Sequence, residues 1–401
     1  MNGTVVMTDL DLLPALRKPF STTVMYSLLV FQVAVISISI AAASMAFGIL
    51  LMFLLYWTIS ERKWIFSRTP LDFFFLAYVV IEFLTAANAV FPAQAFFNSK
   101  RLLLISNVYL VLASFDSRER VRNSLMTVFG VVAVLSVVEI FYYYIAREGR
   151  LSIFQHYMTT GGLKMIVCLL IVPFLLHGKT PRKIKIWFSF LFVPPFLALL
   201  LTNTRSSWVG FLLGFVVLSF LKNKYLFFVL VLFLALFFLF APARQINRAK
   251  SIIDPSDLTN HTRLVMWSTG MKIFADHPLL GIGDSDVHEV YVQYKSPDDP
   301  EGGGHLHNNY VQLLVTLGLV GFSVVAVMLA KVLMVEYAVF KKTAADWLAG
   351  SVALGAFAAF IGFLANGFFE WNFGDHEIMV FVWFTVGLTL AASRFFDAER
   401  V

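Results

Sequence analysis

Apolar runs of close to 20 residues recur along this chain, and short polar segments separate them. A helix needs about 20 apolar residues to cross a bilayer, and it satisfies its own backbone hydrogen bonds inside lipid. The 401 residues are 59% hydrophobic and only 14% charged, which is too apolar for a soluble domain of this length. We therefore predict an all-α polytopic membrane protein with about twelve transmembrane helices.

The expected spans fall into two groups around one long polar stretch. Residues 1–241 form an N-terminal transmembrane region of about nine helices, and residues 308–401 form a C-terminal region of about three. Between them, residues 242–307 form a large loop in which we expect amphipathic helices. The predicted spans are 25–58 (two helices turning near 41–44), 71–90, 100–114, 122–145, 162–176, 186–201, 207–221, 226–240, 308–335, 347–369 and 378–392.

Lysine and arginine gather in alternate loops, which predicts the orientation of the chain. By the positive-inside rule both termini are cytoplasmic, and the 242–307 loop lies on the opposite side of the membrane. The net charge of +6 is therefore an orientation signal, and we expect no nucleic acid partner. Arg205 lies in a short loop on the loop side and needs another explanation.

A polar cluster at 202–208 surrounds Arg205. A guanidinium at a membrane boundary costs free energy unless it is paired or faces a water-filled cavity. Its planar fork suits bidentate binding of phosphate. Two interpretations remain open, an anion site and an interfacial arginine that reaches lipid headgroups.

The long loop contains a second arginine, Arg263, at the start of a predicted amphipathic helix. Apolar residues recur at helical spacing between 262 and 275, at Leu264, Trp267, Met271 and Phe274. Arg263 would lie in the first turn, where the helix dipole disfavours a cation, so its placement suggests anion binding. The alternative is a structural pairing with Asp257.

Histidines mark the end of the loop, at His305 and His307. An imidazole here suits a general base or a counter-charge for phosphate, with Asn308 or Tyr310 orienting it. The competing interpretation of His305 alone is a solvated loop histidine. A zinc site would use the same loop, but the spacing offers no fixed third ligand, so we expect no metal.

A last polar turn, 370–377, is acidic and aromatic. Trp371 is suited to stack on a sugar face, although an aromatic belt at the interface would look the same. If His307 only contacts phosphate, Glu370 or Asp375 is the next candidate for a base.

The order of these motifs resembles the O-antigen ligase and polymerase superfamily of bacterial envelopes. The resemblance covers residues 202–321. It rests on Thr-x-Thr-Arg-Ser from 202, Thr-Arg-x-x-x-Trp from 262, His-Pro-Leu-x-Gly-x-Gly from 277, His-Asn-x-Tyr-x-Gln from 307 and Leu-Gly-Leu-x-Gly from 317.

The resemblance implies a GT-C-like glycosyltransferase, an O-antigen ligase of lipopolysaccharide biosynthesis in the bacterial inner membrane. Its partners would be an undecaprenyl-pyrophosphate-linked glycan as donor, a lipid A-core sugar hydroxyl as acceptor, and membrane lipid, with no metal or other cofactor. Arg205 and Arg263 match the family's anion-binding arginines, and His307 matches its essential histidine. The further substrate-binding candidates are His305, Asn308, Tyr310, Trp267, Glu370 and Trp371.

Direct displacement with inversion is the expected mechanism, in a monomer whose active site faces the periplasm. A polymerase or a protein O-oligosaccharyltransferase would use the same donor chemistry with a different acceptor. The position of the large loop, just before the third-last span, favours the ligase. A transporter of lipid-linked glycan would place polar groups near mid-membrane and on both sides, whereas these gather on one side.

Overall fold

The computed structural model describes residues 19–61, 67–146, 149–297, 299 and 304–398, and this part of the chain is helical without a β-strand. Eight helices are long and apolar enough to cross a membrane, and two shorter apolar helices accompany them at Thr22–Val35 and Tyr225–Phe240. The prediction of an all-α polytopic membrane protein is confirmed. Both chain ends, and with them the predicted cytoplasmic position of the N-terminus, lie outside the described residues.

The N-terminal region runs from α1 to α10. Its helices are α1 (Pro19–Val35), α2 (Ile40–Glu61), α3 (Asp72–Ala87), α4 (Pro92–Asn98), the 3-10 helix η1 (Ser99–Ile105), α5 (Ser106–Ser114), α6 (Arg118–Ala146), α7 (Tyr157–Leu176), α8 (Arg182–Leu201), α9 (Arg205–Lys222) and α10 (Tyr225–Phe240).

The described residues form eight long spans instead of the predicted twelve, because the other predicted spans are short or divided helices. The predicted span 100–114 is divided between η1 and α5, and both pieces are too short to cross a membrane. The helices α1, α3 and α10 have 17, 16 and 16 residues, below the length that a bilayer usually requires. The first turn falls at residues 36–39, before the predicted 41–44.

The C-terminal helices α14 (Asn309–Thr343), α15 (Ala349–Asn366) and α16 (His376–Ala398) pack with α7 and α9 to form the interior of the bundle. Small residues allow the close approach of these helices. A Cβ on Gly210 of α9 would lie 2.6 Å from the carbonyl oxygen of Gly362 on α15, so the two backbones are in contact there. The residues of α7, α15 and α16 are mostly buried, which identifies these helices as the core.

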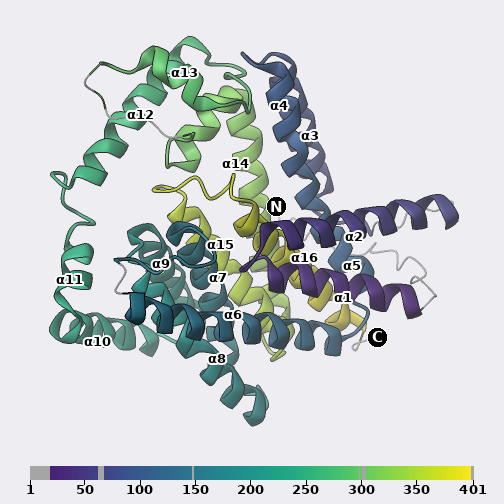
Figure 1. The fold of residues 1–401 in the computed structure, drawn as a ribbon. Coiled ribbons are helices and arrows are strands. Elements are labelled where there is room, and N and C mark those ends of the chain that lie inside the picture. The colour runs from purple at the N-terminus through teal and green to yellow at the C-terminus, as the bar shows by residue number, and fades with distance from the viewer. Residues whose placement is uncertain (1–18, 62–66, 147–148, 298, 300–303, 399–401) are drawn as a thin grey trace, which may run out of the picture.

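The polar stretch forms α11 (Ala243–Lys250), α12 (Leu258–Asp276) and α13 (Val287–Tyr294). In Figure 1 these green helices arch from α10 past one end of the bundle and rejoin it at α14. We call this end the loop end. Met266 and Ile273 of α12 pack with Val315 of α14 in a small second core.

A glycine-rich segment, residues 278–283, packs into a break in α14. Gly318 has φ 63° and ψ −173°, a conformation that interrupts the helix and that only glycine adopts readily. The break exposes carbonyl groups, and Ile282 N donates to Val315 O at 2.9 Å. In return, Leu319 N donates to Pro278 O at 2.8 Å. The two glycine motifs of the sequence are thus the two sides of one backbone contact, which fixes the long loop on the bundle.

We expect Gly318→Ala to destabilise the protein strongly. A Cβ at Gly318 would lie 2.3 Å from the Leu279 backbone, and the backbone conformation itself costs on the order of 1–3 kcal/mol for other residues. Thermal unfolding in detergent, followed by tryptophan fluorescence, should show a lower Tm. Gly130→Ala is the matched control, because a Cβ on Gly130 in α6 would meet, among the described residues, nothing within 4 Å beyond its chain neighbours and its own helix backbone. Equal Tm values for the two variants would contradict this account of the break.

Candidate active site

Arg205 is the first residue of α9 and connects that helix to the long loop. Its side chain is 5% exposed, and Nη1 donates to Ser251 O at 2.7 Å and to Asp257 Oδ1 at 3.1 Å. Its Nη2 is buried and has no hydrogen-bond partner among the described residues. Buried donors are nearly always satisfied in native proteins, so this nitrogen is available to a ligand.

Asp257 also caps α12, since its carboxylate accepts a hydrogen bond from Asn260 N. Partial burial raises the pKa of this carboxyl, but the charge of Arg205 and the hydrogen bonds outweigh it and lower the pKa. The sequence interpretation offered Asp257 as a partner for Arg263, but in the structure it pairs with Arg205. Arg263 is not in the first turn either, because α12 begins at Leu258. The dipole argument therefore does not apply to it.

Arg263 faces the α15–α16 turn, residues 367–375. Its Nη2 lies 3.7 Å from Glu370 Oε2, and the arginine side chain is 9% exposed. Burial lowers the pKa of Arg263 and the charge of Glu370 raises it. A guanidinium held at this distance from its carboxylate retains donors for a second anion.

His307 contacts the same carboxylate. Its Nδ1 lies 3.0 Å from Glu370 Oε1 and 3.2 Å from Oε2. With an ionised Glu370 as acceptor, the proton of a neutral imidazole is on Nδ1 and the lone pair is on Nε2. The side chain is 27% exposed, so Nε2 can be reached. His307 also has φ 48°, a left-handed conformation that is uncommon outside glycine and often marks functional sites.

Electrostatics assign different roles to the two groups beside His307. Burial raises the pKa of Glu370. The hydrogen bond from His307 and the charges of His307, His305 and Arg263 lower it by more, so the net shift of the pKa is downward. Burial and the charge of His307 lower the pKa of His305 to about 4. Glu370 is therefore an anion near neutral pH, and His305 is uncharged.

The backbone around His307 is held from both sides. Trp267 Nε1 donates to Leu306 O at 3.0 Å, and Gln312 Oε1 accepts from Leu306 N at 2.9 Å. His305 Nδ1 accepts a hydrogen bond from His307 N at 3.3 Å. Trp267, predicted to contact substrate, thus has a structural contact that positions the His305–His307 segment.

Asn308 and Tyr310 have structural hydrogen bonds as well. The Asn308 side chain caps α14 by accepting from Tyr310 N at 2.8 Å and from Val311 N at 3.1 Å. The Tyr310 hydroxyl donates to Leu364 O at 2.8 Å. Glu370, rather than either of these predicted residues, therefore orients the ring of His307.

Two further arginines near Arg205 were not among the predicted site residues, Arg150 and Arg248. Arg248 Nε donates to the carbonyl of Asn203, another residue with left-handed backbone, φ 53°. Burial, together with the charges of Arg205 and Arg150, lowers the pKa of Arg248 to about 10. The positive-inside rule disfavours basic residues on the loop side of the membrane. The presence of Arg150 and Arg248 on that side is a signal in the sequence that could have identified them.

His156, just before the start of α7, was also missed. Burial lowers its pKa, and the charges that act on it include those of Glu370 and His307. Arg150 stacks on Tyr157, with its guanidinium carbon 4.2 Å from the ring centre. The α6–α7 loop therefore forms part of the site.

His305, His307 and Glu370 have the spacing to hold a metal ion, with one ligand atom from each within 4.8 Å of the others. The sequence offered no fixed third ligand, and the structure supplies one from a distant turn. Two features disfavour a cation at this cluster. The Arg263 guanidinium lies 3.7 Å from the Glu370 carboxylate, and His307 Nδ1 is already engaged with that carboxylate.

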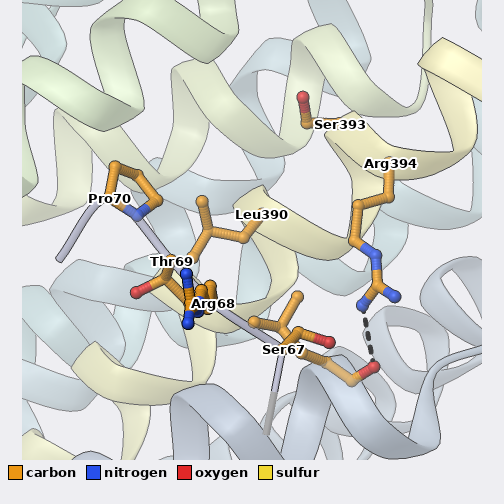
Figure 2. Close-up of a pocket in the computed structure, with 8 residues that line it drawn as sticks. Ser67, Arg68, Thr69, Pro70, Leu390, Ser393 and Arg394 are labelled. Carbon is orange, nitrogen blue, oxygen red and sulfur yellow. Dashed lines mark hydrogen bonds between the residues drawn. The ribbon is translucent and has the colours of Figure 1, made fainter. Parts of the chain in front are cut away.

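A small pocket lies at the other end of α16, about 20 Å³ in volume and far along the helix from the α15–α16 turn. Figure 2 shows Arg394 beside it, with its guanidinium donating to the Leu112 carbonyl at 2.9 Å. This volume holds about one water molecule, so the pocket carries no chemistry comparable to the loop end.

Part of the chain is similar to a known protein family. Residues 190–326 match the family model described as O-Antigen ligase. The matched range contains Arg205, Arg263 and His307 but ends before Glu370. A search of curated proteins found no match for the chain. The similarity to O-antigen ligases thus lies in residues 190–326, about a third of the chain.

Proposed function

We propose that this protein transfers a glycan from undecaprenyl pyrophosphate to a sugar hydroxyl of lipid A-core, at the periplasmic face of the bacterial inner membrane. The observation that carries the proposal is the His307–Glu370 pair beside the Arg205 and Arg263 guanidinium groups at the loop end. This arrangement combines a general base with a site for an anionic leaving group.

The arginines would bind the pyrophosphate of the donor. Arg205 has a spare buried nitrogen, and Arg263 is only loosely paired with Glu370. Cleavage of the bond between the sugar C1 and the phosphate oxygen develops negative charge on the leaving group. Guanidinium groups stabilise that charge more in the transition state than in the ground state, which is the condition for catalysis.

His307 would act as the base for the acceptor. Its Nε2 accepts the hydroxyl proton while the acceptor oxygen forms the new bond to C1. The C1–phosphate bond breaks, and its electron pair leaves with the pyrophosphate. Glu370 stabilises the imidazolium that forms, because it accepts from Nδ1 throughout. The product has the opposite anomeric configuration to the donor. No metal is needed, since the guanidinium groups supply the positive charge.

Removal of either part of this machinery should abolish most of the transfer. With purified protein, a lipid-linked glycan and rough lipopolysaccharide, we expect Arg205→Ala to lower kcat by roughly 10²–10³-fold. His307→Ala should lower it by roughly 10²–10⁴-fold, the usual contribution of a general base. Product is measured as glycan attached to lipid A-core, with a chelator present throughout. Arg394→Ala is the control, a part-buried arginine at the opposite end of α16.

Other outcomes identify other functions. Growth of glycan on the lipid carrier would mean a polymerase, and transfer to serine or threonine of a protein would mean an oligosaccharyltransferase. Loss of activity with chelator would contradict the metal-independent mechanism and favour the His305–His307–Glu370 metal cluster. Translocation without consumption of the donor would mean a transporter.

Glu370 should act through His307, and two substitutions at position 370 test this. We expect Glu370→Gln to lower kcat by roughly 10²–10³-fold, since an orienting carboxylate and its charge are lost. Glu370→Asp should recover part of the rate, because it restores a carboxylate. A Glu370→Asp rate no higher than that of Glu370→Gln would contradict this role of the carboxylate.

A further inference from the structure

A cavity of about 850 Å³ lies next to the segments that carry His307 and Glu370, although neither of these two residues lines it. Gly304, Gln312 and Trp371 line its near end. Gly304 directly precedes His305, and Trp371 directly follows Glu370. The volume lies within the range of roughly 300–1,000 Å³ that is typical of ligand pockets. The cavity is therefore large enough for a substrate, and residues within three positions of His307 and Glu370 form part of its wall.

The two ends of the cavity differ in chemistry. The start of η1, the loop before α13 and the start of α16 contribute polar residues to the lining, Lys100, Arg101, Asp284, Asp286, Asp375 and His376. Toward α2 and the buried face of α16 the lining is apolar, with Ile40, Phe47, Leu103, Met379 and Trp383. A lining that changes from charged to apolar along its length matches an amphiphile, with a polar head and a hydrocarbon tail.

The polar end contains groups that lack partners in the protein. Arg101 Nε, Ser285 Oγ and His376 Nε2 are buried without a hydrogen-bond partner in the described chain. Ser285 is itself only 6% exposed. Buried polar atoms around a cavity are usually satisfied by ligand or water, and three among the lining residues suit the hydroxyl groups of a sugar.

Arg101 fixes the wall beside Trp371. Its guanidinium lies 3.0 Å from Glu82 Oε1 and 3.0 Å from Asp284 Oδ2. It also lies 5.8 Å from the centre of the Trp371 ring. These two ion pairs connect η1 to α3 and to the loop before α13, so Trp371 has a rigid neighbour. A rigid aromatic face is suited to stack on a sugar ring.

The apolar end opens between α2 and η1. Ile40 on α2 is 47% exposed and Leu103 on η1 is 51% exposed, although both line the cavity. Exposed apolar residues of a membrane protein face lipid, so this end is in contact with the bilayer. A lipid tail could remain in the membrane while its head enters the cavity.

The arginine cluster lies elsewhere. Among the described residues that line the cavity, there is no Arg150, Arg205, Arg248 or Arg263. Displacement with inversion requires the acceptor hydroxyl to approach C1 from the side opposite the leaving group. Pyrophosphate on the arginines therefore places the acceptor on the other side of the His307–Glu370 pair, and Gly304 and Trp371 connect that pair to the cavity.

We propose that this cavity is the binding site of the acceptor glycolipid, which enters laterally between α2 and η1. Its sugar head lies against Trp371 with the reacting hydroxyl directed at His307, and its lipid portion remains at the Ile40–Leu103 opening. The assignment rests on the proposed transferase function, and it locates the acceptor opposite the arginine cluster that would hold the donor.

Cysteine labelling tests the assignment without turnover. The chain has one cysteine, Cys168, which is fully buried, so unmodified protein provides the background. Ser44→Cys and Leu103→Cys place a thiol on each side of the opening. Phe141→Cys, on α6 at a site 69% exposed and outside the cavity, is the control. Each is treated with a maleimide in the presence of rough lipopolysaccharide or of undecaprenyl-pyrophosphate-linked glycan.

We expect rough lipopolysaccharide to slow labelling at positions 44 and 103 at least tenfold, with the lipid-linked glycan leaving it unchanged. The rate of labelling at position 141 should be unchanged by either lipid. Protection by the lipid-linked glycan alone would assign the cavity to the donor and overturn the proposal. Labelling that neither lipid alters would overturn it as well.

Kinetics separate this assignment from the proposed function. In a transfer-active protein, Ser44→Trp should raise the KM for rough lipopolysaccharide at least tenfold and leave the KM for the donor unchanged. Trp371→Ala should raise the acceptor KM by about two- to tenfold, the value of one aromatic contact. A wild-type protein that transfers nothing would reject the proposed function, whereas normal transfer with an unchanged acceptor KM in both variants would reject only the acceptor site.

Discussion

The site at the loop end depends on one buried carboxylate, that of Glu370. It lies in the turn between α15 and α16, and it contacts His307 before α14 and Arg263 in α12. Three segments far apart in the sequence therefore meet at a single negative charge. Without it, Arg263 would lose its ion-pair partner, and the imidazole would lose the acceptor that fixes its tautomer. Unpaired buried charges cost several kcal/mol, so this contact holds both the geometry and the loop.

Two further sets of contacts hold in place the three segments that meet at Glu370. The 278–283 segment packs into the break at Gly318 and forms backbone hydrogen bonds there. These hydrogen bonds do not depend on side-chain identity, except where the backbone conformation requires glycine. Arg205 connects the start of α9 to the cap of α12 through Asp257. Both ends of α12 are thus fixed to the bundle. A long polar loop held at both ends can place a side chain such as Arg263 reproducibly beside the membrane domain.

The sequence predicted those parts of the site that residue type and periodicity reveal. Arg205 was found because a guanidinium on the loop side has no topological reason to be there, and His307 because it follows a glycine release. Arg263 was found through the family resemblance and through a helix-dipole argument that its position beyond the first turn of α12 does not support. Helical spans of ordinary length were predicted from their apolar runs. The sequence did not predict that Asp257 pairs with Arg205, or that Glu370 is the partner of His307. Those pairings join residues 52 and 63 positions apart, and only the packed helices bring them together. Short elements such as η1 were missed because a broken helix is as apolar as an intact one.

The balance of charge at the loop end is itself an argument for an anionic substrate. Four guanidinium groups, of Arg150, Arg205, Arg248 and Arg263, act on one another, as the pKa of Arg248 shows. The carboxylates that the structure places among them are Asp257 and Glu370. Like charges at a membrane boundary raise the free energy of the folded protein, and the two carboxylates offset only part of this. A pyrophosphate would offset the remainder and would gain more as it leaves the sugar. The repulsion that opposes folding is thus the same free energy that, in the proposed reaction, would favour the transition state.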